Sequence, residues 1–290
     1  ARRRAGRRAA DELLGREVAL KQVRLADQPD AALARERTMR EARIVAALHH
    51  PHIVSIFDVV QENDEPWLVL EFMPSRSLGS VLAERGTLPP LEVAAIGADV
   101  AGALAAAHAA GIVHRDVKPD NVLLSLPSAA GPVVKLTDFG IAHTAAAPVL
   151  TATHLVTGTP AYFAPETARG EDTDPRSDVY SLGATLYAAV EGHPPFGAGA
   201  SNVLALLARI GRGGAPAPER AGPLTEVLRH LTADDPAARP TAAQARDALR
   251  AIADGPAPAV ATAAPTATRS RRGLRVGAAV GAAVAVVTGV

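Results

Sequence analysis

The sequence predicts an α+β fold in which a small, strand-rich lobe precedes a larger helical lobe. Apolar and polar residues alternate in several short runs before residue 73, as they do in half-buried strands. From residue 90 onward, long runs rich in alanine and leucine have the spacing of helices. After residue 254 the composition shifts to proline, alanine and threonine, so we expect the folded part to end there.

The first lobe is expected to contain three strands and one helix. Residues 17–25 (EVALKQVRL) alternate enough for a strand, and residues 32–50 place apolar side chains at helical spacing among good helix formers. Two more strands are predicted at residues 52–60 and 66–73, on either side of the polar turn QENDE.

The second lobe is expected to begin with a helix over residues 91–111, which Gly111 ends. Short strands follow near residues 121–125 and 133–139. An irregular stretch then runs to about residue 165, and helical patterns continue to about residue 254.

The composition excludes several classes of function. The chain of 290 residues has a formal net charge of zero, which argues against binding nucleic acid through overall charge. It has no cysteine, so disulfides, thiol catalysis and thiolate metal sites are excluded. The absence of cysteine suits a reducing cytoplasm. The length of the chain allows a large hydrophobic core.

Lysine is scarce in this chain. Of the 30 basic residues, Lys21, Lys118 and Lys135 are lysines and the other 27 are arginines, a bias typical of a GC-rich genome. A lysine retained against such a bias is a candidate for chemistry, because a guanidinium does not replace the compact ammonium in every site. Lys135, two residues before Thr137 on a predicted strand, is interpreted as a solvated surface residue.

Residues 111–124 (GIVHRDVKPDNVLL) gather an unusual number of polar groups between apolar flanks. Asp116, Lys118 and Asn121 place a carboxylate, an ammonium and an amide on one short loop. Phosphoryl transfer needs such groups to orient a hydroxyl, neutralise the moving phosphoryl group and hold a metal. A single Asp or Asn in a loop more often caps a helix or a turn, so the prediction rests on the combination.

HRDVKPDN resembles the catalytic loop of protein kinases, and three further stretches resemble kinase landmarks in the family's order. VALK places Lys21 on a strand before the predicted helix that carries Glu41, TDFG supplies Asp138, and APE stands at residues 164–166. The resemblance covers residues 9 to about 254. It implies the two-lobed protein kinase fold, with a small lobe at residues 1–73 and a large lobe at residues 74–254.

The resemblance implies ATP and Mg²⁺ as cofactors and protein hydroxyls as substrates. Asp116 is implied as the catalytic base, and Lys118 as the lysine that contacts the transferring phosphate. The residues implied in nucleotide binding or metal binding are Lys21, Glu41, Glu71, Met73, Asn121 and Asp138.

Within that set, each residue matches a different part of a kinase site. Lys21 matches the lysine that holds the α- and β-phosphates, and Glu41 matches its helix partner. Asn121 and Asp138 match the metal ligands. Residues 71–73 match the hinge whose backbone bonds adenine, and Leu70 precedes them at the gatekeeper position.

The stretch TATHLVTGTPAYFAPE (151–166) resembles the substrate-binding segment of Ser/Thr kinases, with Thr159 at the position of a family threonine. Thr151 and Thr153 stand where membrane-anchored bacterial Ser/Thr kinases of actinobacterial type carry activating phosphates. A phosphate there would add negative charge that Arg115, beside Asp116, could bind.

Three other residues are implied as structural support. Glu166 of APE resembles the glutamate that pairs with a late arginine, here Arg239. Asp178 in RSDVYSLG matches the aspartate that braces the catalytic loop. The histidines of the stretch HHPHI, which could suggest a metal site, are interpreted as part of a structural turn that the family also has.

The C-terminal residues predict a membrane anchor. Residues 255–275 are a Pro/Ala-rich and then basic linker, and residues 276–290 carry no charge. At about 1.5 Å per residue the latter span roughly 22 Å, short of the roughly 30 Å hydrocarbon core, so we interpret them as a truncated transmembrane helix. The alternative is a small apolar helix that packs on the domain. The preceding arginines would keep the kinase domain cytoplasmic, on a single-pass protein of the cell membrane.

The N-terminal residues depart from the family pattern. Kinases open with a glycine-rich loop, G-x-G-x-x-G-x-V, which should occupy roughly residues 1–6 and those just before, where this chain has ARRRAG. We therefore expect the glycine-rich loop, the first strand and most of the second strand to be missing or replaced. Either the gene model starts late or the protein is a degraded kinase.

Two classes of function follow. The first is a Ser/Thr protein kinase in signal transduction, which transfers the γ-phosphate of ATP to proteins. A homodimer of the kinase is a further expectation. The second is a catalytically impaired, kinase-like interaction module that lost its nucleotide lid. Small-molecule phosphotransferases that share the scaffold are disfavoured, because they lack an APE-type activation segment.

Overall fold

The computed structural model describes residues 7–23, 31–62, 65–126, 132–139, 160–197 and 202–255. These residues belong to one compact unit that ends at Pro256. Residues 1–6, the threonines at positions 151, 153 and 159, and the predicted linker and anchor lie outside the described residues.

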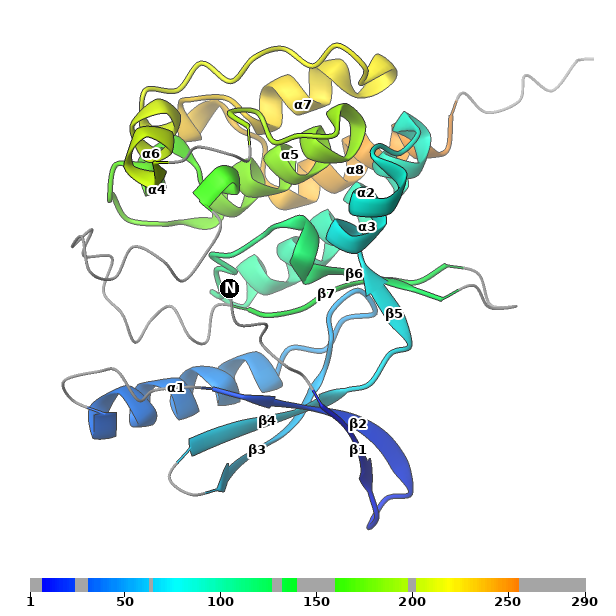
Figure 1. Ribbon diagram of the computed structural model, residues 1–290, viewed down its shortest axis with the longest axis vertical. Coiled ribbons are helices and arrows are strands. Elements are labelled where there is room, and N and C mark those ends of the chain that lie inside the picture. The colour runs from blue at the N-terminus through cyan, green and yellow to red at the C-terminus, as the bar shows by residue number, and fades with distance from the viewer. Residues whose placement is uncertain are drawn as a thin grey trace, which may run out of the picture. The chain divides into compact units, whose positions relative to one another are not determined.

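The small lobe is built on a four-stranded antiparallel sheet with the strand order β1-β2-β4-β3 (Figure 1). The strands are β1 (Arg7–Asp11), β2 (Arg16–Gln22), β3 (Ile56–Glu62) and β4 (Glu65–Glu71). The sequence predicted β2, β3 and β4 but not β1.

Strand β1 corrects the expectation that most of the strand before VALK is missing. It pairs with β2 along its whole length, from Arg7 opposite Leu20 to Asp11 opposite Arg16. The turn between them is closed by the Leu14 amide, which donates to the Asp11 carboxylate at 3.1 Å, and by Gly15 at φ +62°. The RRAAD sequence has little β propensity, so pairing with β2 and this turn determine its conformation. The expected loss of the glycine-rich loop stays a prediction.

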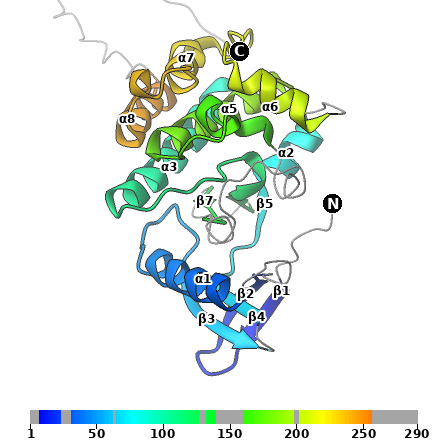
Figure 2. The same cartoon turned by 90° about the vertical axis from the view of Figure 1, so that its left-hand side faces the viewer.

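Helix α1 (Ala31–Ala46) packs against one face of this sheet, beside β3 and β4, as Figures 1 and 2 both show. Ala42 and Val45 are buried in the contact, while Arg40, Arg43 and Ile44 face outward. The predicted helix over 32–50 ends early, because the next residues leave the small lobe. The Val54 amide bonds the Leu136 carbonyl, and the Leu136 amide bonds the His52 carbonyl, at 3.0 and 2.8 Å.

The large lobe starts with two elements that the sequence did not predict, strand β5 (Ser75–Ser77) and helix α2 (Leu78–Arg85). Strand β5 joins β6 (Val122–Ser125) and β7 (Val134–Leu136) in a second antiparallel sheet, in the order β5-β6-β7. Both strands β6 and β7 were predicted. Helix α2 is short, and Ser77 caps its start: the Ser77 hydroxyl oxygen accepts a hydrogen bond from the Ser80 amide at 3.1 Å.

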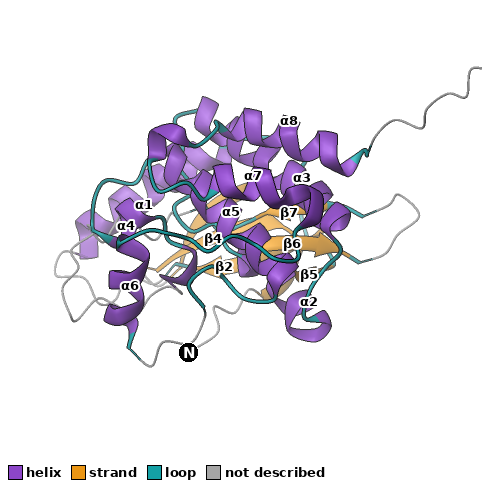
Figure 3. Cartoon of the chain, turned by 90° about the horizontal axis from the view of Figure 1, so that it is seen from above, coloured by secondary structure: helices purple, strands orange, loops and turns teal. Residues whose placement is uncertain are grey.

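Helix α3 packs against β7 of this second sheet, and α3, α5, α7 and α8 pack together (Figure 3). The bounds of the helices after α2 are α3 (Pro90–Ala109), α4 (Pro165–Ala168), α5 (Pro175–Glu191), α6 (Val203–Gly211), α7 (Thr225–Leu231) and α8 (Ala242–Ala253). Gly183 allows α5 to approach α7, because a Cβ there would lie 2.7 Å from the Leu231 Cβ. One apolar core runs from Val45 and Leu68 of the small lobe through Ile53 to Leu186 and Leu249.

Among the described residues, helix α3 alone has the length and apolar character that crossing a membrane requires. Eleven of its 20 residues are buried, between α5, α8 and β7, so it serves as a core helix of the large lobe. The predicted anchor at residues 276–290 is not among the described residues.

Candidate active site

A buried carboxylate holds the loop that follows helix α3. Asp178, near the start of α5, is 1% exposed and accepts the backbone amides of His114 and Arg115 at 2.7 and 2.8 Å. His108 of α3 contacts the same carboxylate at 2.8 Å. These bonds fix Arg115 at φ +66°, a left-handed conformation that is strained for a residue with a side chain.

His114 links this loop to the TDFG segment. Its Nδ1 accepts the Asp116 amide at 3.2 Å, which leaves Nε2 to donate to the Thr137 carbonyl at 3.0 Å. The ring lies against Phe139, with the centroids 4.6 Å apart. Complete burial lowers the pKa of His114, so the neutral ring that these two bonds require is the stable form. This role of His114 was not predicted from the sequence, although His114 is part of HRDVKPDN.

Three predicted site residues meet at the end of the loop. The Lys118 ammonium lies 2.7 Å from both carboxylate oxygens of Asp116. The Asn121 amide nitrogen donates to the Asp116 carbonyl at 2.7 Å and to its carboxylate at 3.0 Å. Asp116 and Asn121 are buried, whereas Arg115 points outward. The Asp116 carboxylate is thus oriented by two donors from its own loop, the ammonium of Lys118 and the side-chain amide of Asn121.

Lys21 and Asp138 form an ion pair between the two lobes. Lys21 comes from β2, and Asp138 follows β7 at φ +66°, which aspartate adopts more readily than most residues. Thr137 stabilises the turn, because its amide bonds the Asn121 carbonyl at 2.9 Å. Glu41, which the sequence predicted as the partner of Lys21, lies half-buried in α1.

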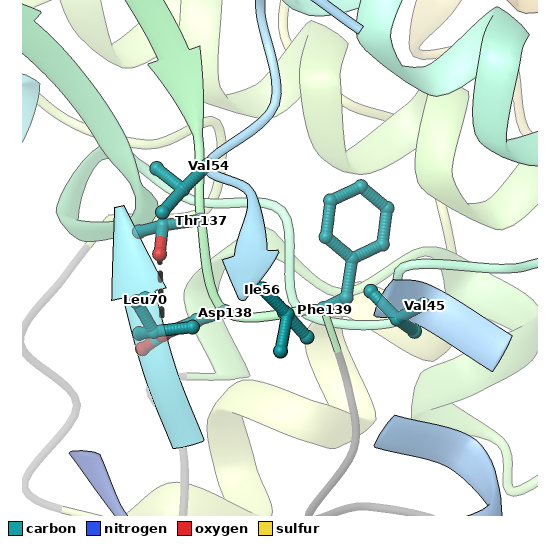
Figure 4. A pocket seen from close by; sticks show the side chains of 7 residues that line it. All are labelled: Val45, Val54, Ile56, Leu70, Thr137, Asp138 and Phe139. Atoms are coloured by element: carbon teal, nitrogen blue, oxygen red, sulfur yellow. Dashed lines mark hydrogen bonds between the residues drawn. The ribbon is translucent and has the colours of Figure 1, made fainter. Parts of the chain in front are cut away.

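The predicted hinge, residues 71–73, begins at the last residue of β4. The Glu71 amide is bonded to the Ser55 carbonyl at 2.9 Å, and the Met73 carbonyl accepts the Ser75 hydroxyl at 2.8 Å. Behind it, a small cavity is lined by Leu70, Val45, Val54 and Ile56, and by the segment 137–139 (Figure 4). Leu70 therefore stands between the hinge and the cavity, as a gatekeeper would.

Lys135 corrects one prediction, because it is not a solvated surface residue. Its side chain is 13% exposed, and its ammonium lies 3.0 Å from the Glu71 carboxylate and 3.3 Å from the Ile53 carbonyl. This pair was not predicted from the sequence, because the two residues lie 64 positions apart.

Glu166 and Arg239 form a buried, two-pronged ion pair at 2.6 and 2.8 Å. Burial favours a higher pKa for Glu166, but hydrogen bonds from Arg239 and Ser177 outweigh it and hold the pKa below the usual value. The Arg239 guanidinium also lies over the Tyr180 ring, 4.9 Å from its centroid. The pair joins α4 to the loop before α8.

Burial also raises the pKa of Tyr162 to about 12, with a further contribution from Asp120. Tyr162 therefore stays neutral at physiological pH. Together with Phe163 and Phe196 it packs on the apolar cluster of α6 around Leu207. Tyr162 and Phe163 lie directly before APE, in the stretch that resembles the substrate-binding segment of Ser/Thr kinases.

The comparisons with known proteins agree with this geometry. Residues 7–249 match the family described as "Protein kinase domain". Serine/threonine-protein kinase PknL of Mycobacterium tuberculosis is 43% identical over 189 residues, 65% of this chain and 46% of PknL. Serine/threonine-protein kinase PkaA of Streptomyces coelicolor is 40% identical over 245 residues, 83% of this chain and 44% of PkaA.

Among solved structures, residues 1–466 of Rad53 in complex with AMP-PNP align with a TM-score of 0.66 and 28% identity, over 83% of this chain and 59% of that one. The chain belongs to the protein kinase domain family, and the two-lobed fold follows. It spans less than half the length of the curated kinases PknL and PkaA.

Replacement of Arg239 by Met should strongly destabilise the large lobe. It leaves the Glu166 carboxylate buried without its counter-charge, which typically costs about 3–5 kcal/mol. Because the folded-state pKa of Glu166 is lowered from 4.5, this contribution is present above pH 4.5 and is lost as the pH falls through the lowered value. Urea denaturation at pH 7 measures it.

Arg229→Met is the matched control, because Arg229 and its partner Glu226 are 60% and 70% exposed. Exposed pairs contribute about 0–1 kcal/mol, so this variant should unfold like the parent. Equal free energies of unfolding for the two variants would contradict the assigned role of Glu166 and Arg239.

Proposed function

We propose that this chain is an ATP-dependent Ser/Thr protein kinase that phosphorylates proteins in signal transduction. The observation that carries the proposal is the cluster of Asp116, Lys118 and Asn121, together with the ion pair of Lys21 and Asp138. The two groups are linked by the bond from the Thr137 amide to the Asn121 carbonyl. The kinase names of the relatives and the nucleotide analogue in the Rad53 structure support it.

In the proposed reaction, a substrate hydroxyl oxygen attacks the γ-phosphorus and the bond to the β–γ bridging oxygen breaks, which releases ADP. The Asp116 carboxylate accepts the hydroxyl proton. Lys118 lies against that carboxylate and supplies positive charge toward the transferring group. Lys21 would hold the α- and β-phosphates once it moves from Asp138, and backbone groups of Glu71 and Met73 would bond adenine.

The residues present also fit Mg²⁺, which is held in proteins by one or two carboxylates, waters and substrate phosphates. Asp138 supplies a carboxylate. The Asn121 amide nitrogen is engaged by Asp116, so its amide oxygen is the atom suited to a metal. When bound, the ion would neutralise phosphate charge.

Asp116→Asn tests the assignment of the base. The amide keeps the size of the side chain but accepts a proton poorly, so phosphate transfer to a generic basic protein should fall about 10²- to 10⁴-fold. Binding of nucleotide should stay within about threefold. Radioactive phosphate transfer and nucleotide titration measure the two effects.

Asp247→Asn, the same change at an exposed position of α8, is the matched control and should transfer phosphate at the parental rate. Phosphate transfer by Asp116→Asn within threefold of the parent would contradict the assignment of Asp116 as the catalytic base. A parent chain that transfers no phosphate would favour the kinase-like interaction module instead.

We also propose Thr151 and Thr153 as phosphorylation sites. Both lie outside the described residues, and the support is their place in the sequence and the outward position of Arg115 near the base. Phosphopeptide mapping of active protein should find phosphate on at least one threonine. Double replacement by Ala should lower activity without unfolding, and full activity in that variant would refute the role.

The proposed organisation is a kinase domain at residues 1–254, a linker at 255–275 and a membrane-spanning segment that begins at residue 276. The uncharged composition of residues 276–290 after a basic run supports it. The full chain should sediment with membranes when expressed in bacteria, and residues 1–254 should not. Equal distribution of the two forms would remove the anchor from the proposal.

A further inference from the structure

Lys135 is the one lysine of the three that the proposed chemistry does not use. Its ammonium is nearly buried and bridges two acceptors, the Glu71 carboxylate at 3.0 Å and the Ile53 carbonyl at 3.3 Å. The Glu71 carboxylate oxygen that it contacts also accepts the Ser55 amide at 3.2 Å. A partly buried charge network of this kind needs each partner, because a charge left alone there is costly.

The network joins three segments at the boundary of the lobes. Glu71 is the last residue of β4 and the first of the segment 71–73 that would bond adenine. Lys135 lies on β7, three residues before Asp138, the proposed metal ligand. Ile53 and Ser55 belong to the segment that leaves the small lobe and bonds β7.

Backbone bonds fix two sides of this triangle. The Glu71 amide bonds the Ser55 carbonyl at 2.9 Å, and the Val54 amide bonds the Leu136 carbonyl at 3.0 Å. The ion pair of Lys135 and Glu71 provides the third side, directly between the hinge and β7. It therefore sets the position of the adenine-binding backbone relative to the phosphate and metal end of the site.

We propose that Lys135 is a positioning residue for nucleotide binding, which acts through Glu71 to hold the hinge in its nucleotide-binding geometry. The inference rests on the proposed function, because it assumes that segment 71–73 binds adenine. Lys135 contacts neither the nucleotide nor the reacting atoms. A hinge ordered in advance loses less conformational entropy when a ligand binds, and this raises the affinity.

The matched experiment uses the full chain and titrates Mg²⁺ with AMP-PNP, a nucleotide that is not turned over. Lys135→Met and Glu71→Gln should each weaken binding about 5- to 20-fold, in the lower part of the range for coupling between sites. The double variant should be no weaker than either single variant, because each change removes the same interaction. In Lys135→Met, turnover at saturating nucleotide should stay near the parental kcat, so that the loss is in KM.

Arg76→Met is the control. Arg76 follows the hinge on β5 and pairs with Glu84 at 2.5 Å, but both side chains are exposed and the pair does not reach β7. Its affinity for AMP-PNP should equal that of the parent. This separates the Lys135 pair from the general effect of removing a charge near the hinge.

A second readout needs neither nucleotide nor substrate. In Lys135→Met, the backbone amides of residues 71–73 and of Ser75 should exchange hydrogen faster than in the parent, while those of α5 stay protected. Unchanged exchange, affinity within twofold of the parent, or single effects that add in the double variant would overturn the inference. A parent that binds AMP-PNP but transfers no phosphate would overturn the proposed function alone.

Discussion

The active site depends on one buried carboxylate, that of Asp178. Two backbone amides of the catalytic loop and one histidine converge on it, in a place where an unpaired negative charge would be very costly. The bonds are charge-assisted, and they hold Arg115 in a left-handed conformation that a free loop would rarely adopt. The side chain of the next residue, Asp116, is aimed into the site by that turn of the backbone.

From this anchor the order spreads to the TDFG segment through His114 and Asn121. The ring of His114 bonds the Thr137 carbonyl, and the carbonyl of Asn121 accepts the Thr137 amide. Asp138, the next residue, then meets Lys21 from the small lobe. Polar side chains from three distant stretches of the chain are thus held by hydrogen bonds and one ion pair, and the two lobes share one apolar core.

The sequence predicted several contacts of the candidate site, because the residues that make them are concentrated in short motifs. Asp116, Lys118 and Asn121 meet as expected, as do Glu166 and Arg239. It failed where distant segments determine the outcome. The partner of Lys135 lies far along the chain, and strand β1 forms from RRAAD because β2 supplies the pairing. Helix α2 is too short for a clear period, and depends on the cap at Ser77.

If Asp178 orients the proposed base Asp116 through the backbone of the loop, replacement of Asp178 by Asn should disturb both the loop and phosphate transfer. The amide fills the same space but carries no charge and turns one donor toward the loop. We expect a folded variant in which the amides of His114 and Arg115 exchange hydrogen faster and phosphate transfer falls at least about 100-fold, as is typical of a displacement near 1 Å. Parental exchange at both amides together with transfer within threefold of the parent would contradict it.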